Sequence, residues 1–275
     1  MTARPAHFTR TAEHEFLPTA NARSRWGDDH LNGPALVGLA AWNLGDRHGD
    51  DDFLPARLTV DLFKAARGVP TEVSTRTIRE GRRVRNAECE LRQDGVVVVR
   101  ATLVQYRRSS APRGETWSTA MEFPHPEDQR GQDDDDTRHA RMGSDQGGWS
   151  DDIADHQNPS RKRFMTKPID AVQGTRNGPF VNAAMSAEHT SLVTNLGSAG
   201  IGYINGDVTV GLARLPRDEW IGVQADSHWA SEGIAVGAAT LFDRDGAFGS
   251  AIVTAVSNPA AQIDFTEHRS ALRAH

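Results

Sequence analysis

Cysteine is almost absent from this chain, because Cys89 is the only one among 275 residues. A single cysteine cannot form an internal disulfide, and it lacks the partners of a zinc site. Long apolar segments are missing too: the longest uncharged stretches, 33–45 and 248–263, contain Asn, Ser or Pro. Both fall short of the roughly 18 apolar residues of a spanning helix. These absences argue against a disulfide framework, a metal centre and a membrane span, and the single cysteine suits a reducing compartment.

Excess positive charge is also lacking. Lys and Arg number 31 against 37 Asp and Glu, which gives a net charge of −6 and a pI near 6.0. Electrostatic attraction to nucleic acid or to an anionic membrane is therefore not expected. The first ten residues, MTARPAHFTR, lack the apolar core of a signal peptide. We expect a cytoplasmic protein that needs no cofactor and binds neither nucleic acid nor membrane.

A polar segment divides the chain into two more apolar parts. Residues 111–166 are rich in Asp, Arg, Gln, Gly and Pro, and their few apolar residues show little periodicity. Such a composition buries little surface. We interpret 111–166 as an acidic polar linker, partly disordered around 129–148, between domains at 1–110 and 167–275. The run Asp133–Asp136 is interpreted as solvated linker rather than a metal site.

The two flanking parts repeat one another. Four short matches occur in the same order, at offsets of 145 to 152 residues: 32–34 with 177–179, 43–45 with 195–197, 58–64 with 208–214, and 94–95 with 245–246. Matches in a constant order indicate an internal duplication. The offset grows by seven between the first two pairs, so we expect the second copy's helix to be about two turns longer.

Each copy has the pattern of one buried helix and four strands. The first helix is expected at 35–44, after the cap Asn32, and it is apolar nearly all round. The strands expected in the first copy are 56–64, 71–78, 84–91 and 96–106. The second copy is expected to have a helix at 180–196 and strands at 202–212, 220–228, 234–242 and 249–257. Asp-Gly pairs at 94–95 and 245–246 are hairpin signals.

A sheet that wraps one apolar helix, present twice, resembles the hotdog fold in tandem. The chain is similar to the acyl-CoA thioesterase II type, in its actinobacterial form, through five segments: 25–33 (RWGDDHLNG), 58–63 (LTVDLF), 79–83 (REGRR), 204–214 and 218–220 (DEW). The resemblance implies an α+β double hotdog, with two antiparallel sheets that each wrap a central helix. Segments 58–64 and 208–214 would pair antiparallel and join the sheets into one.

The resemblance also implies a function in fatty acid metabolism. Members hydrolyse an acyl thioester of coenzyme A or of an acyl-carrier protein with an activated water, and hotdog units often form homo-oligomers. Backbone amides at a helix start would hold the oxyanion, which places substrate near Asn32 and Gly33 or near Asn177 and Gly178. The acyl chain would lie between helix and sheet, in a substrate pocket that His189 and Val253 are also expected to line.

The family's catalytic groups are an Asp, a Thr and a Gln on three strands of the second copy. The matching candidates are Asp207 and Ser227, while Val253 stands at the Gln position. The stretch Asn205-Gly206-Asp207 is equally compatible with turn chemistry alone. Because valine cannot hold a water, the sequence predicts weak turnover. The alternatives are an acyl-thioester-binding protein with weakened catalysis, and a dehydratase or cyclase that pairs His189 with Asp207.

Overall fold

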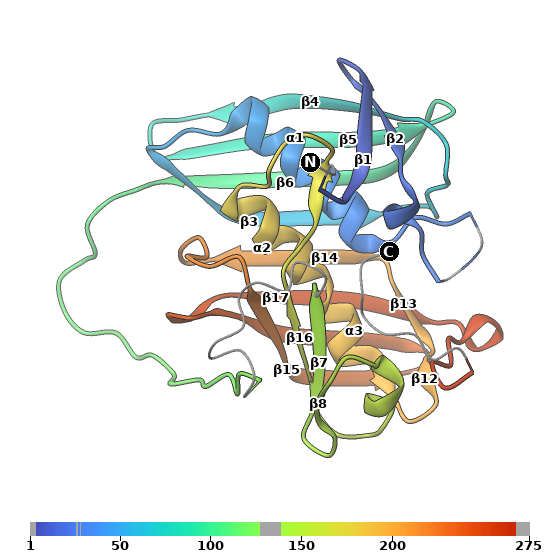
Figure 1. Ribbon diagram of the computed structural model, residues 1–275. Coiled ribbons are helices and arrows are strands. Elements are labelled where there is room, and N and C mark those ends of the chain that lie inside the picture. Colours follow the sequence, from blue (N-terminus) through green and yellow to red (C-terminus); the bar gives the residue numbers. More distant parts are fainter. Residues whose placement is uncertain (1–3, 26, 28, 127–138, 268–275) are drawn as a thin grey trace.

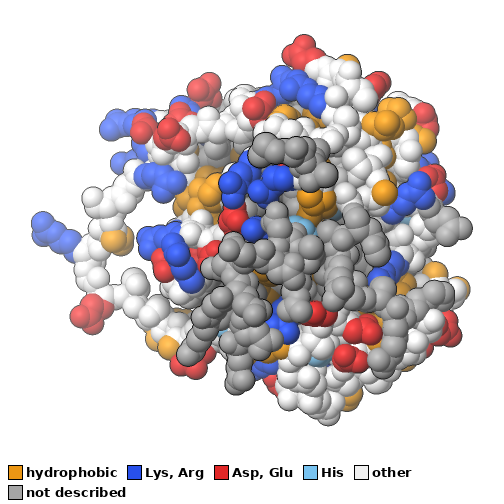
Figure 2. Space-filling view, in the orientation of Figure 1, with side chains coloured by type: hydrophobic (Ala, Val, Ile, Leu, Met, Phe, Trp, Pro, Cys, Tyr) orange, Lys and Arg blue, Asp and Glu red, His pale blue; other side chains and the backbone are white. Residues whose placement is uncertain are grey.

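The computed structural model describes residues 4–25, 27, 29–126 and 139–267. Two units, each with a sheet and a central helical segment, lie one above the other and share one continuous sheet (Figure 1). This is the α+β double hotdog that the sequence predicts. On the face drawn in Figure 2, basic and acidic side chains are interspersed over the described residues. None of the described helices is both long and apolar enough to cross a membrane.

The main strands lie where the alternation of apolar residues places them. In the first unit they are β3 (Phe53–Leu62), β4 (Thr71–Glu80), β5 (Val84–Gln93) and β6 (Val96–Arg107). In the second unit they are β13 (Tyr203–Asn205), β14 (Asp207–Leu212), β15 (Ile221–Ser231), β16 (Ile234–Asp243) and β17 (Gly246–Ser257). Both expected hairpins form, with positive φ at Asp94 (50°), Gly95 (76°) and Gly246 (99°).

The two sheets join where the repeated segments meet. Strands β3 and β14 pair antiparallel, with Val60 opposite Val208 and Leu58 opposite Val210. These four side chains are buried. On the opposite face the hydroxyls of Thr59 and Thr209 lie 3.0 Å apart. The predicted joint is therefore confirmed, and the strand order is β4-β5-β6-β3-β14-β17-β16-β15 across it.

The helices differ from the expected lengths. Helix α1 (Gly33–His48) is 16 residues long, continues past Gly45 to His48, and ends where the Gly49 N–H donates to the Gly45 carbonyl. The second unit has α2 (Pro179–Glu188) and α3 (Thr190–Asn195), which together are about as long as α1. The expected two-turn difference is wrong, because one helical glycine costs only about 1 kcal/mol and did not end α1. The extra residues form a hairpin of β11 (Leu196–Gly197) and β12 (Gly200–Ile201).

The segment expected as a linker contains part of the second sheet. It holds β7 (Ala140–Ser144), β8 (Gly148–Ser150), the 3-10 turn η3 (Ile153–His156) and β9 (Lys162–Thr166). Strand β9 pairs with β15, and Met142 and Phe164 are buried. These strands are short and rich in Arg, Gly and Ser, so they show no clear alternation. Residues 127–138, with Asp133–Asp136 and the first half of the expected disorder, lie outside the described residues.

Further short elements complete the outer edge of the first unit. Strands β1 (Ala6–Ala12) and β2 (Glu15–Pro18) extend the sheet beside β4, and β10 (Asp170–Val172) pairs parallel with β1. The 3-10 turns η1 (Ala20–Ala22) and η4 (Pro259–Ala261) lie in connecting segments. None of these elements was expected from the sequence.

The central helices pack against each other and run in opposite directions. A Cβ on Gly38 of α1 would lie 2.9 Å from Met185 of α2, and one on Gly45 would lie 3.7 Å from Phe180. Glycine at position 38 therefore allows the two helices to approach closely. As a result, the C-terminal end of α2 lies at the N-terminal end of α1.

Candidate active site

A cavity of about 470 Å³ opens where α1 begins, at the junction of the two units. We call it the α1 cavity. Its wall includes Gly33 and Leu36 of α1, Glu188 of α2, Asn205 of β13, and Phe63 and Lys64 after β3. The first unit therefore supplies a helix start and the second unit supplies the only carboxylic acid among the described residues of this wall.

The Glu188 carboxyl is packed against the first residue of α1. The side chain is only 9% exposed, and the Asn205 side-chain amide donates a hydrogen bond of 3.3 Å to Glu188 Oε1. A Cβ on Gly33 would lie 2.0 Å from that same oxygen. Only glycine at position 33 leaves room for the carboxyl, so the close contact depends on a residue without a side chain.

The pKa of the Glu188 carboxyl is far above the ordinary range of a glutamate. Burial raises its pKa from an ordinary value of 4.5 to about 8, and the hydrogen bond from Asn205 acts in the opposite direction. The positive end of the α1 dipole also favours the charged form. A carboxyl with a pKa close to the working pH exchanges protons in the range where general bases are effective.

The first turn of α1 presents a backbone donor beside this carboxyl. Asn32 Oδ1 accepts the Ala35 N–H at 2.8 Å, and Pro34 has no N–H to offer. Among the described residues, no acceptor is assigned to the Gly33 N–H, and Gly33 lines the cavity. An amide at a helix start favours developing negative charge. The cavity can therefore polarise a carbonyl and activate a water at neighbouring positions.

The duplication creates a second helix start with a cavity beside it, but the side chains there differ from those of the α1 cavity. A cavity of about 590 Å³ lies at the start of α2 and includes Gly178 and Phe180 in its wall. Because the helical segments are about equally long, the offset of 145 between the helix starts holds along them, and it relates Glu188 to Asn43. The short match of 43–45 with 195–197 therefore does not correspond to equivalent positions in the structure. Asn43 is buried, and its amide donates to the Leu39 carbonyl of its own helix at 2.9 Å. The buried glutamate is thus present in only one of the two related positions.

The remaining residues expected to bind substrate have different surroundings. The Asn177 side chain accepts from the Ala171 N–H at 2.8 Å and donates to the Ile169 carbonyl at 2.9 Å, so it fixes the chain before α2. His189 lies at the break between α2 and α3 and stacks on Phe164, with ring centroids 4.4 Å apart. Burial lowers the pKa of His189 to about 4, so its ring is neutral.

The structure does not bring Asp207, Ser227 and Val253 to one place. Asp207 accepts hydrogen bonds from the backbone N–H (2.9 Å) and the hydroxyl of Thr254, whose side chain is exposed on the outer face of the sheet. Val253 is fully buried on the inner face. Ser227 lines a separate cavity beyond α3. None of the three lines the α1 cavity, and Asp207 is not placed to pair with His189.

Glu188 and Asn205 are the residues of this site that sequence reasoning missed as functional. The available signal was a single acidic residue at the end of the apolar run 183–187 in the second helix. An ionisable residue on a helix that is buried on most sides requires either a partner or a function. Asn205 is such a partner, and the α1 cavity exposes the remaining surface of the Glu188 carboxyl to a possible ligand.

Comparisons with known proteins agree with this architecture. The model of the acyl-CoA thioesterase N-terminal domain matches residues 22–106, and that of the acyl-CoA thioesterase C-terminal domain matches residues 126–252. None of the curated proteins matches the sequence. The C-terminal match begins well before residue 167, in keeping with the strands found in the expected linker.

Solved structures with the same fold have little sequence identity to this chain. The tesB protein of Mycobacterium avium subsp. paratuberculosis has a TM-score of 0.62 at 15% identity, covering 92% of this chain and 96% of its own. The acyl-CoA thioesterase II TesB2 of Mycobacterium marinum has a TM-score of 0.58 at 13% identity, covering 91% and 95%. A protein of Alicyclobacillus acidocaldarius described as having a hot dog fold has a TM-score of 0.64 at 13% identity, also covering 91% and 95%.

Thioester hydrolysis is the class of reaction that these family matches support. Both halves of the chain match, in the order found in a tandem thioesterase, and the shared sheet of the structure joins them into one double hotdog. The chain belongs to the acyl-CoA thioesterase family, whose N-terminal and C-terminal domain models both match it.

Proposed function

We propose that this protein hydrolyses acyl-CoA thioesters in the α1 cavity, with Glu188 as the general base and the Gly33 N–H as the oxyanion donor. The observation that carries the proposal is the contact between a buried carboxyl with a pKa of about 8 and the start of a helix. The family supplies the reaction class. The geometry supplies a base and a donor on opposite units of the double hotdog.

The reaction would use both groups in sequence. The thioester carbonyl accepts a hydrogen bond from the Gly33 N–H, while ionised Glu188 takes a proton from a water molecule. The resulting hydroxide adds to the carbonyl carbon and gives a tetrahedral oxyanion beside the helix start. When the C–S bond breaks, the thiolate takes the proton back from Glu188. Acid and free thiol leave, and the carboxylate is restored.

The wall of the cavity suits an acyl-CoA at two points. Leu31 and Leu36 offer apolar surface next to Gly33 for the start of an acyl chain. Lys64 and the exposed Phe63 stand at the opening. A lysine there can attract the negatively charged phosphates of coenzyme A through long-range electrostatics. An acyl-carrier protein would bring a phosphopantetheine arm to the same opening.

Purified protein incubated with acyl-CoAs of increasing chain length tests the proposal by release of free thiol. Hydrolysis that saturates with substrate is the expected result, and the same acyl groups on a carrier protein decide between the two carriers. Binding of acyl-CoA without thiol release across the whole panel would contradict the proposal and favour the binding-protein alternative.

The rate should rise with pH through about pH 8. Glu188 acts only when ionised, and its carboxyl is mostly protonated below its raised pKa. We therefore expect log(kcat/KM) to increase with a slope near one up to about pH 8 and then to level off. Steady-state rates between pH 5.5 and 9.5 measure this. A rate that is already independent of pH from pH 5.5 upward would exclude Glu188 as the base.

Asp207→Asn separates the site in the α1 cavity from the site expected from sequence alignment. The sequence-based assignment predicts a loss of at least about tenfold, the lower range of general-base effects. The α1 cavity predicts a rate within about twofold of wild type, because the Asp207 carboxyl is bonded to Thr254 on the outer face. Initial rates are compared at equal folded fraction, confirmed by melting temperature. A tenfold loss would return the assignment to Asp207.

A further inference from the structure

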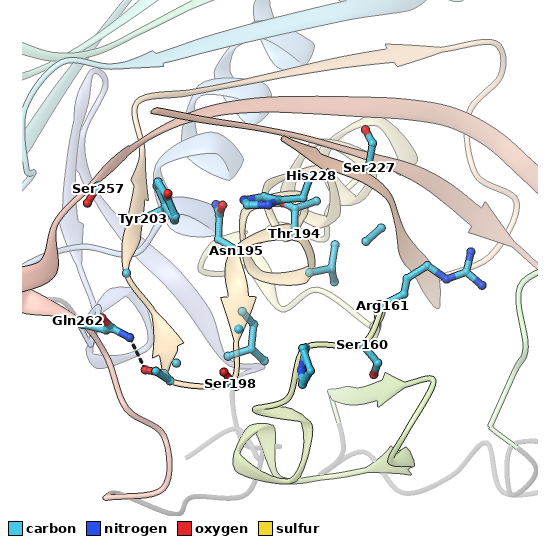
Figure 3. Close-up of a pocket in the computed structure, with 18 of the residues that line it drawn as sticks. Ser160, Arg161, Thr194, Asn195, Ser198, Tyr203, Ser227, His228, Ser257 and Gln262 are labelled. Atoms are coloured by element: carbon cyan, nitrogen blue, oxygen red, sulfur yellow. Dashed lines mark hydrogen bonds between the residues drawn. The ribbon is translucent and has the colours of Figure 1, made fainter. Parts of the chain in front are cut away.

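A second cavity lies beyond the end of α3 and has no role in the proposed reaction. Its volume is about 590 Å³, and we call it the α3 cavity. Figure 3 shows Asn195, Tyr203 and His228 around one space, drawn from α3, β13 and β15. Strand β13 separates the two cavities, because Tyr203 lines the α3 cavity whereas Ile204 and Asn205 line the α1 cavity.

Asn195 is the unusual residue of this wall. Its side chain is 6% exposed, yet Oδ1 has no hydrogen-bond partner among the described residues. A buried amide oxygen without a donor is destabilising, because it has lost its hydrogen bond to water and gained none in the protein. An orphaned acceptor at a cavity wall is satisfied when a ligand donates to it. The α3 cavity thus has a defined point of recognition that calls for a hydrogen-bond donor.

Asn195 also begins a chain of hydrogen bonds that ends on Glu188. Asn195 Nδ2 donates to Ser191 Oγ at 3.4 Å, and the Ser191 hydroxyl donates to Asn205 Oδ1 at 3.0 Å. Asn205 Nδ2 in turn donates to Glu188 Oε1 at 3.3 Å. All three bonds point in the same direction, toward the carboxyl. Hydrogen bonds aligned in this way polarise one another by roughly 10–30% each.

The rest of the wall favours an uncharged ring. Tyr203 and His228 present aromatic rings in an edge-to-face arrangement with centroids 5.9 Å apart. Val193 and Leu196 add apolar surface. At the rim, Arg161 and Asp226 carry opposite charges, so neither sign of ligand charge is selected. An aromatic or apolar ring that carries one hydroxyl matches these features, because the hydroxyl can donate to Asn195 Oδ1.

We propose that the α3 cavity is a second binding site, which takes an uncharged phenolic ring by a hydrogen bond to Asn195 and thereby enhances the action of Glu188. A ligand hydroxyl that donates to Asn195 Oδ1 makes the Asn195 amide N–H a stronger donor. The effect passes through Ser191 and Asn205 and stabilises the ionised form of the base. The coupling rests on the function proposed for the α1 cavity, whereas the binding does not.

Phenol and anisole form a matched pair of probes for the binding, because anisole has the same ring but no hydroxyl donor. Their dissociation constants are measured by ligand-observed NMR titration of the full chain without substrate. We expect phenol to bind at least about tenfold more tightly than anisole, as one satisfied buried acceptor implies. In Asn195→Leu this preference should disappear. Equal binding of the two probes, or binding of neither, overturns the site.

The coupling is tested separately by thioester hydrolysis at saturating phenol. We expect kcat/KM to rise by about two- to fivefold in wild type, in keeping with modest polarisation along each bond. Ser191→Ala interrupts the chain but leaves Asn195 Oδ1 in place. This variant should bind phenol as wild type does and lose the rate increase. Competition between phenol and acyl-CoA would make the cavity part of the substrate site and overturn the second-site assignment.

The two arms also distinguish failure of this proposal from failure of the proposed function. If the wild-type protein hydrolyses no thioester but still prefers phenol over anisole, the proposed α3 site stands and the proposed function fails. If it hydrolyses acyl-CoA but shows no preference for phenol, the proposed function stands and the proposed α3 site fails. Melting temperatures of the Asn195→Leu and Ser191→Ala variants confirm that each comparison is made on folded protein.

Discussion

Glu188→Gln should lower kcat/KM for acyl-CoA by about 10²–10⁴-fold, the range expected when a general base is lost. Glutamine has nearly the same shape and can keep a hydrogen bond with Asn205, but it cannot take a proton from water. The acyl-CoA should still bind, because the Gly33 N–H and the apolar wall are unchanged. The measurement is steady-state kinetics with a substrate-binding assay, and unaltered turnover would exclude Glu188 from the chemistry.

The same substitution should change stability in a direction that depends on pH. The folded-state pKa of Glu188 is about 8 against 4.5 as the ordinary value, so the folded protein holds this proton more tightly than the unfolded chain. The cost of ionising the buried carboxyl is therefore absent below pH 4.5 and increases as the pH rises toward 8. Glutamine has no such cost. At pH 8 the variant should be more stable by on the order of 2–4 kcal/mol.

Urea unfolding of both proteins at pH 4.5 and pH 8 checks this sign. The difference in free energy of unfolding should be small at the lower pH and favour the glutamine variant at the higher pH. A variant that is less stable than wild type at pH 8 would show that the carboxylate has a stabilising partner. Loss of activity together with a gain of stability is the combination expected of a residue kept for function.

Gly33→Ala should have the second largest effect, because it acts on both halves of the site. The new methyl group would lie 2.0 Å from Glu188 Oε1 and 2.2 Å from its Cδ, so the carboxyl must move away from the helix start. Displacement of a catalytic group by about 1 Å can cost 10²-fold in rate. We expect a loss of that size in kcat/KM, with a destabilisation of about 1–3 kcal/mol from overpacking.

Gly178→Ala is the matched control for this variant. Gly178 stands at the related helix start of the second unit, and a Cβ there would meet nothing within 4 Å. Activity and melting temperature should both remain close to wild type. Equal losses in the two variants would mean that alanine disturbs helix starts in general. A normal rate in Gly33→Ala would show that the contact with Glu188 is not needed for catalysis.

Several features of this protein follow from local sequence. The alternation in 58–64 and 208–214, the Asp-Gly turns and the Asn-Gly-Pro helix starts each reflect backbone preferences of a few neighbouring residues. Because the same local pattern occurs twice, the duplication could be predicted from the residues alone, and the resemblance to double-hotdog proteins added the fold and the antiparallel joint. That resemblance also placed substrate near Gly33 at a helix start, and Gly33 does line the α1 cavity.

Other features could not be found in this way. The short strands β7, β8 and β9 are held by pairing with β15 and with each other, so their own composition resembles a linker. Asp207 and Val253 were aligned by position along the chain, but successive residues of a strand point to opposite faces of the sheet. A one-residue difference in register moves a side chain from the cavity side to the outer face, and Asp207 lies on the outer face.

The sequence by itself determined the repeat, the positions of the central helices and the strands that meet at the joint, because these depend on periodicity within short segments. The antiparallel pairing of those strands followed from the resemblance to double-hotdog proteins. Only the tertiary structure decided where the proposed catalytic groups lie. Glu188 meets Gly33 because α1 and α2 pack antiparallel, with Gly38 against Met185, and this brings the end of one repeat's helix to the start of the other's. The raised pKa of Glu188 has the same origin, since burial between the two units, and no neighbouring residue in sequence, removes the carboxyl from water.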